Sequence, residues 1–524
     1  MEHGMLIHQF FDYHTRRNPE HQCLLFQGKS FNYAAIAAES IRIANGLRDQ
    51  GIDRNDRVAT LCENCPEVLT IILACSRIGA VAVPLNYRLA APEVAYILND
   101  AQAKILIAPD MALVDLLTSI RPLADPALPI IAASAQGAEN WQHWLSQYQD
   151  TAQFTDEIDA NAGILQLYTS GTTGRPKGVV SSQRNIIALY ISSSTSVSVK
   201  AGPGTRDLVC APNFHIGGVG TLLLPVLAGA SVVLHSSFNP MAVVDDLEKH
   251  KIDNMFIVPA MIMAILDYVP NIEQRDFSSL RQLLYGASPI STGLLERALK
   301  IFKCDFYQCY GMTETTGTIV SLSPEDHIRA LRDQPELLQS CGRPQAGVEV
   351  KVVDAQGNTL GIGETGELLI HSEANMLCYY NREQATAETL QDGWIHTGDS
   401  ALIDEHGYIF LRDRIKDMIV SGGENIYPIE IENILSQHPA IGDVAVIGVP
   451  CTKFGETPLA CVVLKPEQSL DEAEMIEFCR GQLAGYKIPR QLKIFDVLPR
   501  NPSGKLLKKD LRMPFWEGHA RGIN

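Results

Sequence analysis

The segment from 168 to 178, YTSGTTGRPKG, contains the residue types that bind phosphate. Its glycines allow backbone N–H groups to approach an anion, its hydroxyl side chains are donors, and Lys177 adds a positive charge. A Walker A loop would need a glycine, four further residues and then Gly-Lys-Ser/Thr. Here Gly174 is followed by Arg175 and Pro176, so the Walker A pattern is absent. A solvated turn is the alternative. The density of donors and glycines favours a phosphate-binding loop of another kind.

Two further motifs carry carboxylates. YGMTE at 310–314 follows the strand-like FYQCY and combines an aromatic ring, a glycine and Glu314, which suits base stacking and a Mg²⁺-binding acid. HTGD at 396–399 places Asp399 in a loop, where a carboxylate can accept both hydroxyls of a ribose. Either motif alone usually has a structural role, so they indicate a nucleotide site only when they occur together.

A second glycine pattern, GIGETG at 361–366, has the spacing of a dinucleotide fingerprint. Such a fingerprint follows a strand and opens a helix, whereas this one leads into the strand-like ELLIHS. We interpret it as a hairpin turn.

The elements that must position these motifs alternate along the first half of the chain. RVATL, AVAVPL and KILIA are typical of strands, and EVLTIILACSRIG is typical of a helix that ends at Gly79. From about 347 the pattern becomes period-2 and β-rich, with a turn at His406 and Gly407, and a new βα pattern follows 414. We therefore predict an α/β protein with a large N-terminal domain at 1–414, whose mostly parallel sheets are covered by helices. It would include a β-rich subdomain at about 345–414 and precede a small α+β domain at 415–524.

The composition limits the class of function. A chain of 524 residues with 46% hydrophobic and 20% charged residues is typical of a globular protein with at least two domains. Its net charge of −17 argues against a nucleic-acid partner, because polyanions bind basic surfaces. The partners expected are small molecules or proteins.

The cysteines and the apolar segments indicate the compartment. Twelve scattered cysteines favour a reducing cytoplasm, and Cys62 and Cys65 are interpreted as packing residues, with redox chemistry as the minor alternative. The N-terminus lacks a signal-peptide pattern. The uncharged run 216–234 is long enough to span a membrane, but its glycines and Pro225 favour a buried helix followed by a strand. We expect no transmembrane segment, and peripheral membrane contact stays open.

Seven motifs occur together in a distinctive order: YTSGTTGRPKG, NFHIGG (213–218), YGAS (285–288), YGMTE, TGD, RDRIKDMIVSGGENIYPIEIE (412–432) and NPSGK (501–505). In this combination the chain resembles the adenylate-forming acyl-CoA synthetases, including fatty-acid and aryl-acid CoA ligases. The resemblance covers essentially the whole chain. It implies that the protein activates a carboxylic acid with ATP and Mg²⁺ and transfers the acyl group to CoA.

The resemblance also implies roles for residues at matching positions. Lys505, His215 and Glu314 would be catalytic, Glu314 and Thr169 would bind Mg²⁺, and His215, Gly311 and Thr316 would contact the acid. The expected ATP and AMP contacts are Thr169, Ser170, Gly171, Thr172, Thr173, Gly174, Lys177, Gly286, Ala287, Ser288, Gln308, Tyr310, Gly311, Met312, Thr313, Asp399, Arg414 and Lys505.

The thiol-transfer step would use the C-terminal domain. The family's small domain swings between an adenylating and a thioester-forming pose, and Lys416 matches its hinge position. The expected CoA contacts are Ser421, Gly422, Gly423 and Phe454, the last equally plausible as a core residue.

Three classes of function stay open: a CoA ligase, an adenylating module that loads a carrier protein, and a non-catalytic nucleotide-binding relative. The catalytic positions hold the expected residue types, which disfavours the third class. The small, apolar set around 213–218, 286–289 and 311–316 shows no cation for a second carboxylate and favours a monocarboxylic acid, most simply a medium- or long-chain fatty acid. An aryl acid is the alternative, and a homodimer is left open.

Overall fold

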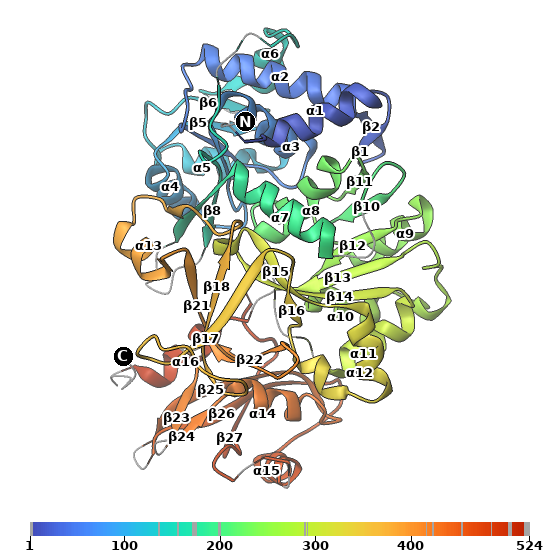
Figure 1. The fold of residues 1–524 in the computed structure, drawn as a ribbon, viewed down its shortest axis with the longest axis vertical. Helices are drawn as coiled ribbons and strands as arrows, with labels where there is room; N and C mark the ends of the chain where they lie inside the picture. Colours follow the sequence, from blue (N-terminus) through green and yellow to red (C-terminus); the bar gives the residue numbers. More distant parts are fainter. Residues whose placement is uncertain are drawn as a thin grey trace.

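The computed structural model describes residues 4–134, 137–152, 154, 157–169, 176–196, 201–287, 290, 292–414, 417–421, 424–451, 454–480, 482–483, 485–500 and 506–517. Helices alternate with strands through most of the first 340 residues, as the sequence pattern predicts. Two large sheets occupy the upper and middle parts of the molecule, and a smaller unit lies at the opposite end from the N-terminus (Figure 1).

The first sheet has the order β19-β9-β8-β4-β3-β5-β6-β7 in the described part of the chain. Strands β8, β4, β3, β5, β6 and β7 run parallel, and β9 returns antiparallel beside β8. The strands are β3 (Arg57–Thr60), β4 (Val81–Pro84), β5 (Ala103–Ala108), β6 (Ile130–Ala132), β7 (Glu139–Asn140), β8 (Gly163–Thr169), β9 (Lys177–Ser182) and β19 (Cys378–Tyr379).

The second sheet has the order β16-β15-β14-β13-β12-β10-β11-β1-β2 among the described residues. Its centre from β14 to β1 is parallel, whereas β15, β16 and β2 pair antiparallel. The strands are β1 (Gln22–Phe26), β2 (Lys29–Asn32), β10 (Arg206–Val209), β11 (Ser231–Leu234), β12 (Asn254–Ile257), β13 (Gln282–Gly286), β14 (Asp305–Met312), β15 (Gly317–Leu322) and β16 (Arg343–Pro344).

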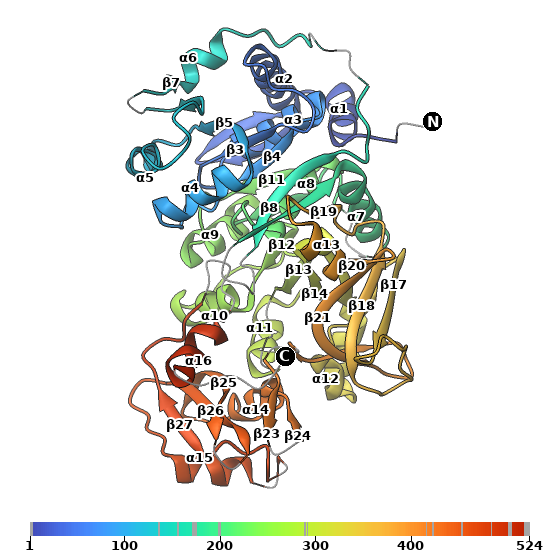
Figure 2. The same ribbon diagram turned by 90° about the vertical axis from the view of Figure 1, so that its left-hand side faces the viewer.

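Helices cover the faces of these sheets and connect their parallel strands, as Figure 2 shows from the side. The helices are α1 (Ile7–Arg17), α2 (Tyr33–Asp49), α3 (Pro66–Ile78), α4 (Ala91–Asp100), α5 (Val114–Ile120), α6 (Trp141–Ser146), α7 (Gln183–Ser196), α8 (Ile216–Leu227), α9 (Pro240–His250), α10 (Pro259–Tyr268), α11 (Thr292–Phe302), α12 (Pro324–Arg332) and α13 (Glu383–Thr389), with short 3-10 turns η1 (Met111–Leu113), η2 (Ile272–Gln274), η3 (Thr313–Thr315) and η4 (Pro335–Gln339).

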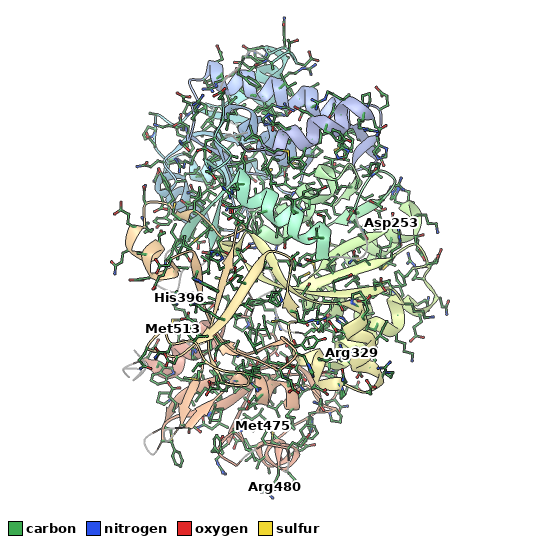
Figure 3. All side chains as sticks on the ribbon, viewed as in Figure 1. Asp253, Arg329, His396, Met475, Arg480 and Met513 are labelled. Carbon is green, nitrogen blue, oxygen red and sulfur yellow. The ribbon has the colours of Figure 1, made fainter. Side chains whose placement is uncertain are left out.

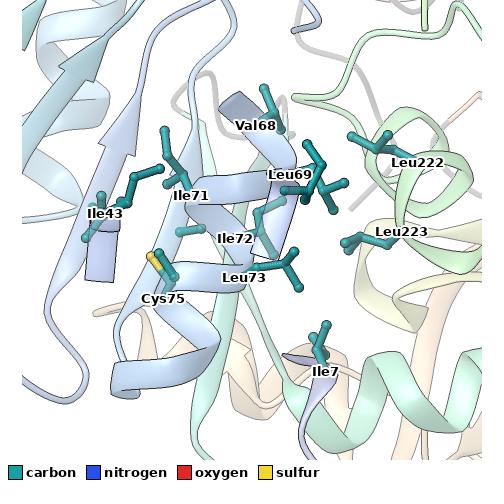
Figure 4. Close-up of a cluster of buried hydrophobic side chains, with 14 of the residues drawn as sticks. Ile7, Ile43, Val68, Leu69, Ile71, Ile72, Leu73, Cys75, Leu222 and Leu223 are labelled. Carbon is teal, nitrogen blue, oxygen red and sulfur yellow. The ribbon is translucent and has the colours of Figure 1, made fainter. Parts of the chain in front are cut away.

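The largest core lies around α3. This helix begins with Pro66 in its first turn and ends at Gly79, whose φ of 76° gives the left-handed cap predicted from the sequence. All of its residues except Glu67 are buried and most of them are apolar, and Figure 4 shows Leu69 and Leu73 opposite Leu222 and Leu223 of α8. Because α3 connects two strands of the first sheet and packs against α8, it fixes the position of α8 relative to that sheet. The turn before α8 is thereby fixed as well.

A β-rich part and the C-terminal unit complete the fold. The β-rich part is a sheet of order β17-β18-β21-β20 with β22 on β21, and the C-terminal unit has the order β24-β23-β26-β25 with β27 on β26, each among the described residues. The remaining elements are β17 (Val348–Val353), β18 (Gly366–Ser372), β20 (Leu390–Gln391), β21 (Trp394–Ile403), β22 (Ile409–Arg414), β23 (Ile419–Ser421), β24 (Glu424–Ile426), β25 (Ile441–Cys451), β26 (Gly455–Leu464), β27 (Gln491–Ile494), α14 (Pro428–Leu435), α15 (Glu472–Cys479) and α16 (Lys508–Trp516). Figure 3 shows Met475 and Arg480 at the far end of this unit. The predicted fold class is confirmed.

Two sequence interpretations are also confirmed. The run 216–234 forms the buried helix α8 and the strand β11, and none of the helices in the described ranges is long and apolar enough to cross a bilayer. GIGETG lies in the turn between the antiparallel strands β17 and β18, so it is a hairpin connection.

Candidate active site

The predicted phosphate-binding motif spans the connection between strands β8 and β9 of an antiparallel hairpin. Thr169 ends β8 and Lys177 begins β9, and the two are cross-strand partners. The hairpin therefore brings the two ends of the predicted loop together. The loop residues Ser170, Gly171, Thr172, Thr173 and Gly174 lie outside the described residues.

A partly buried polar network holds the base of this hairpin. Tyr168 donates its hydroxyl to Asp100 Oδ2 at 2.9 Å and accepts from Gln166 Nε2 at 3.1 Å. Gln166 in turn accepts from Arg57 Nε at 3.3 Å, and Asp100 forms an ion pair with Arg382. Because these partners come from four separate segments, the hairpin is fixed to the sheet and to the chain after β19.

Glu314 lies next to the hairpin in a buried position. It is 7% exposed on the 3-10 turn η3, and its Oε1 accepts a hydrogen bond of 2.6 Å from the Tyr379 hydroxyl. Lys177 Nζ lies 4.9 Å from the centre of the same Tyr379 ring. Burial, followed by the neighbouring Glu314, raises the pKa of Tyr379 well above its usual value, so the phenol keeps its proton. Sequence reasoning brought Lys177 and Glu314 into one site but missed Tyr379.

The environment of Glu314 fits a cation. In the part of the chain that the structure describes, Glu314 has no ion-pair partner, although it is a buried acid. Burying a charge without a counter-ion is costly. Mg²⁺ typically takes one or two carboxylates together with phosphate oxygens. The described residues hold no cluster of three or more His, Cys, Asp or Glu that could hold a metal ion.

A second acid lies beside the aromatic residue of the YGMTE motif. Tyr310, on β14, donates its hydroxyl to Asp399 Oδ2 at 2.7 Å, and Asp399 N donates to Thr397 Oγ1 at 3.0 Å. Burial and then Asp399 raise the pKa of Tyr310 well above its usual value. Arg414 on β22 is the cross-strand partner of Asp399, and its side chain lies outside the described atoms. The predicted residues Tyr310, Asp399 and Arg414 are thus brought together.

Two glycines of the predicted nucleotide site are required by close backbone approach. A Cβ at Gly286 would lie 2.1 Å from the carbonyl oxygen of Cys309, and one at Gly311 would lie 1.9 Å from that of Gly317. Ala287, directly after β13, has a φ of +66°, an uncommon conformation for a residue with a side chain. The backbones of β13 and β14 therefore pack closely at these strand ends. Ser288 lies outside the described residues.

The other predicted contacts surround this strand end. Gln308 Oε1 accepts from the Tyr285 hydroxyl at 3.4 Å, and Met312 N donates to Thr315 Oγ1 at 3.0 Å. Thr316 has a φ of +57°, and its hydroxyl lies 3.0 Å from that of Ser181 on β9. Thr313 begins η3. The turn that carries Glu314 is therefore linked directly to the phosphate hairpin.

His215 precedes α8 and carries an unpaired ring nitrogen. Its Nε2 is buried and has no hydrogen-bond partner among the described residues. Burial, followed by the charge of Arg88, lowers the pKa of His215 to about 4. His215 is therefore neutral near pH 7 and can act there only as a neutral donor or acceptor.

Arg88 is a cation that the sequence analysis did not place near the acid-binding segments. Its guanidinium lies 5.9 Å from the ring of Phe214 and 5.4 Å from that of Tyr87. Phe214 packs on His215 with their ring centres 4.6 Å apart. The sequence did not indicate that Arg88 lies near His215, because Arg88 is about 125 residues from this turn and belongs to no distinctive local motif.

An apolar wall lies close to Thr316. The Cβ position of Gly317 is 3.0 Å from Leu189 of α7 and 3.9 Å from Ile216 of α8. That of Gly217 is 3.2 Å from the Phe256 ring. This neighbourhood provides an apolar surface beside His215.

The C-terminal predictions are only partly described. Ser421 ends β23 and is buried, while Phe454 is 45% exposed, so it is not a core residue. Lys416, Gly422, Gly423 and Lys505 lie outside the described residues.

The fold and this arrangement define a class of α/β proteins in which a hairpin with a predicted phosphate-binding motif lies next to a buried acid. Family models agree with this class. One described as "AMP-binding enzyme" matches residues 11–380, and one described as "AMP-binding enzyme C-terminal domain" matches 430–505. The chain belongs to the AMP-binding enzyme family.

Individual relatives are similar over nearly their full length. A fatty acid–acyl-carrier-protein ligase, ScoC, of Streptomyces coeruleorubidus is 38% identical over 98% of both chains. A feruloyl-CoA synthase of an Amycolatopsis species is 38% identical over 96% of this chain and 97% of its own. The structure of o-succinylbenzoate CoA synthetase from Bacillus subtilis, in complex with ATP and magnesium ion, has a TM-score of 0.83 at 30% identity and covers 96% of this chain and 98% of its own. The predicted resemblance to adenylate-forming CoA ligases is confirmed.

Proposed function

We propose that this protein is an ATP-dependent acid–thiol ligase that converts a carboxylic acid to its acyl-adenylate, releases pyrophosphate and transfers the acyl group to CoA. The observation that carries the proposal is the buried Glu314, which lacks an ion-pair partner in the described structure and lies beside the hairpin that ends in Thr169 and Lys177.

The proposed roles follow from the charges of the reactants. A carboxylate oxygen of the acid attacks the α-phosphorus of ATP, an acyl–phosphate bond forms, and the bond to pyrophosphate breaks. Glu314 and Thr169 would hold Mg²⁺, which offsets the negative charge of the phosphates. The loop from Thr169 to Lys177 would grip the leaving pyrophosphate, and Asp399 with Arg414 would bind the ribose.

A second cation is needed because two anions must meet. His215 is neutral near pH 7 and cannot supply it. Lys505, placed by the NPSGK motif, is the proposed source of positive charge between the carboxylate and the α-phosphate. His215 would instead contact the acid as a neutral group.

The test of this assignment is acid-dependent exchange of labelled pyrophosphate into ATP. We expect Lys505→Ala to reduce the exchange rate at least ~10²-fold, as the loss of one preorganised charge does elsewhere. The control is Lys508→Ala, which removes a nearby lysine paired with Glu432 at 2.9 Å. Exchange by Lys505→Ala at a rate near that of the wild type would contradict the role of Lys505.

The acid is proposed to be a medium- or long-chain fatty acid. The apolar wall of Leu189, Ile216 and Phe256 supports an apolar acyl group. An aryl acid is the second candidate, because the same wall suits a ring and Arg88 lies on the adjoining aromatic cluster. Pyrophosphate release measured over short, medium, long, aromatic and dicarboxylic acids distinguishes them, and a preference for dicarboxylic acids would contradict both.

The acceptor is proposed to be CoA, with a carrier protein as the alternative. The similarity to a carrier-protein ligase over 98% of both chains is the specific reason to keep the alternative. Preformed acyl-adenylate offered to CoA and to phosphopantetheinylated carrier proteins decides between them. Thioester formed only on the carrier protein would overturn CoA as the acceptor and leave the adenylation proposal intact.

A further inference from the structure

Tyr379 lies between the two charged groups of the phosphate site. Its hydroxyl donates to Glu314 Oε1 at 2.6 Å, and the centre of its ring lies 4.9 Å from Lys177 Nζ. The side chain is 6% exposed, and the acid it contacts is 65 residues away in the chain. Contact with both groups at once distinguishes Tyr379 from the other tyrosines of this region.

The backbone around Tyr379 is tied to the same two elements. Tyr379, on β19, pairs with Val179 of β9, two residues after Lys177. Met376 N donates to the carbonyl oxygen of Glu314 at 2.8 Å. The segment 376–379 therefore joins the β8–β9 hairpin to the turn that carries Glu314, through main chain and side chain together.

We propose that Tyr379 is a positioning residue that orients the Glu314 carboxylate toward the metal that accompanies ATP. Its ring, which lies beside Lys177, keeps the carboxylate and the Lys177 ammonium group at a fixed separation. The inference rests on the proposed function, because it gives Glu314 its metal-binding role.

The physical reason lies in the lone pairs of the carboxylate. An ionised carboxylate offers about four lone-pair sites on its two oxygens, and the bond from Tyr379 takes one of the sites on Oε1 and fixes the direction of the carboxylate. Oε2, which does not accept this bond, is then the oxygen better suited to a single, directed bond to a cation. Mg²⁺ requires near-ideal octahedral geometry, which a single oxygen from each ligand suits, whereas Ca²⁺ accepts bidentate carboxylates. Tyr379 should therefore favour Mg²⁺ over Ca²⁺.

The experiment separates metal binding from turnover. Mn²⁺ binding to the full chain is measured by electron paramagnetic resonance in the presence of ATP and without an acid, so that no reaction occurs. Mg²⁺ and Ca²⁺ are then titrated as competitors. We expect Tyr379→Phe, which keeps the ring beside Lys177 but removes the hydroxyl, to weaken Mn²⁺ binding on the order of 10-fold, as loss of a ligand-orienting hydrogen bond does at other metal sites. The preference for Mg²⁺ over Ca²⁺ should fall.

The adjacent tyrosine provides a matched control. Tyr380 donates its hydroxyl to Gln102 at 2.8 Å and packs its ring on Arg57 at 3.9 Å, so it serves a separate set of partners from Glu314 and Lys177. Tyr380→Phe should bind Mn²⁺ like the wild type. Tyr379→Leu also removes the ring and should weaken ATP binding in the absence of metal, which Tyr379→Phe should leave nearly unchanged.

The outcomes distinguish the inference from the proposed function. Unchanged Mn²⁺ affinity and unchanged Mg²⁺ to Ca²⁺ preference in a folded Tyr379→Phe variant would overturn the positioning role, even if the wild type forms acyl-adenylate. Equal losses in Tyr379→Phe and Tyr380→Phe would also overturn it, because they would indicate a general loss of structure. If the wild type itself fails to bind Mn²⁺ with ATP, the metal-binding role of Glu314 fails first.

Discussion

The protonation states of single residues define what each can do in this site. Tyr310 and Tyr379 each donate a hydrogen bond to an acid, and both keep their protons because burial raises their pKa values. His215 is held neutral by burial and by Arg88. In the proposed phosphate site, neutral donors thus hold two carboxylates, and lysine, arginine and the metal would supply the positive charge.

Asp207 allows a pH-dependent prediction away from this site. It lies on β10, and its buried Oδ2 accepts no hydrogen bond among the described residues. Burial raises its pKa from 3.8 to about 7. Because the folded pKa exceeds the unfolded value, the native state favours the proton, and this contribution is complete below pH ~4 and is lost as the pH rises through about 7.

Asp207→Asn should therefore stabilise the protein increasingly as the pH rises from about 4 to 7, with a constant gain above about 7. A shift of this size corresponds to an upper limit of roughly 4 kcal/mol. Urea unfolding midpoints of both proteins at pH 5 and pH 8 measure the difference. Asp392→Asn, at an exposed turn, is the control. A gain at pH 5 as large as that at pH 8 would contradict a titrating Asp207.

At the scale of elements, the site depends on how closely β13, β14 and β15 pack at their ends. The required glycines lie where a neighbouring carbonyl oxygen would come within 2.1 Å of any added Cβ atom. Two atoms cannot approach so closely, so any side chain must push a strand end away. The predicted nucleotide site and the packing of these strand ends therefore share one constraint.

Gly286→Ala tests this constraint. We expect a loss of stability of about 1–3 kcal/mol together with a raised KM for ATP, because the β13 end must move from Cys309. Thermal unfolding and ATP kinetics measure the two effects. Gly293→Ala, where a Cβ would meet nothing within 4 Å at an exposed start of α11, should leave both unchanged. Normal ATP kinetics in a stable Gly286→Ala variant would show that this strand end does not shape the nucleotide site.

The elements themselves were largely predictable, whereas their contacts were not. Apolar periodicity and cap residues predicted α3 with its end at Gly79, and the glycine spacing of 361–366 was correctly separated from a nucleotide fingerprint. The bond from Tyr379 to Glu314 joins residues 65 positions apart, and that from Tyr310 to Asp399 joins residues 89 positions apart. Such pairs depend on strand order and register, which local patterns do not encode.

At the scale of the whole molecule, the C-terminal unit contacts the rest of the chain near the end of β22. Arg412 on β22 lies 3.6 Å from Glu430 of α14, and Lys487 also pairs with Glu430. A partly exposed pair of this kind contributes up to about 1 kcal/mol. That is small enough for a rotation about the following segment to break it, which agrees with the proposed swing of this unit.

Lys416→Pro tests the proposed hinge. Proline restricts φ at its own position and the backbone before it. We expect acid-dependent pyrophosphate exchange to stay within about threefold of the wild type, while thioester formation from preformed acyl-adenylate falls by at least ~10-fold. Lys416→Ala removes the side chain but keeps the backbone free, and should retain both half-reactions. Equal losses of both half-reactions in the proline variant would contradict a hinge at this position.

The most direct test of acyl-adenylate chemistry is to follow the oxygen of the acid. With an acid labelled by ¹⁸O in its carboxylate and with CoA present, attack on the α-phosphorus and later displacement by the thiol must leave one labelled oxygen in AMP. We predict one ¹⁸O atom in the AMP product by mass spectrometry and none in pyrophosphate. Unlabelled AMP, or label in inorganic phosphate, would contradict the account.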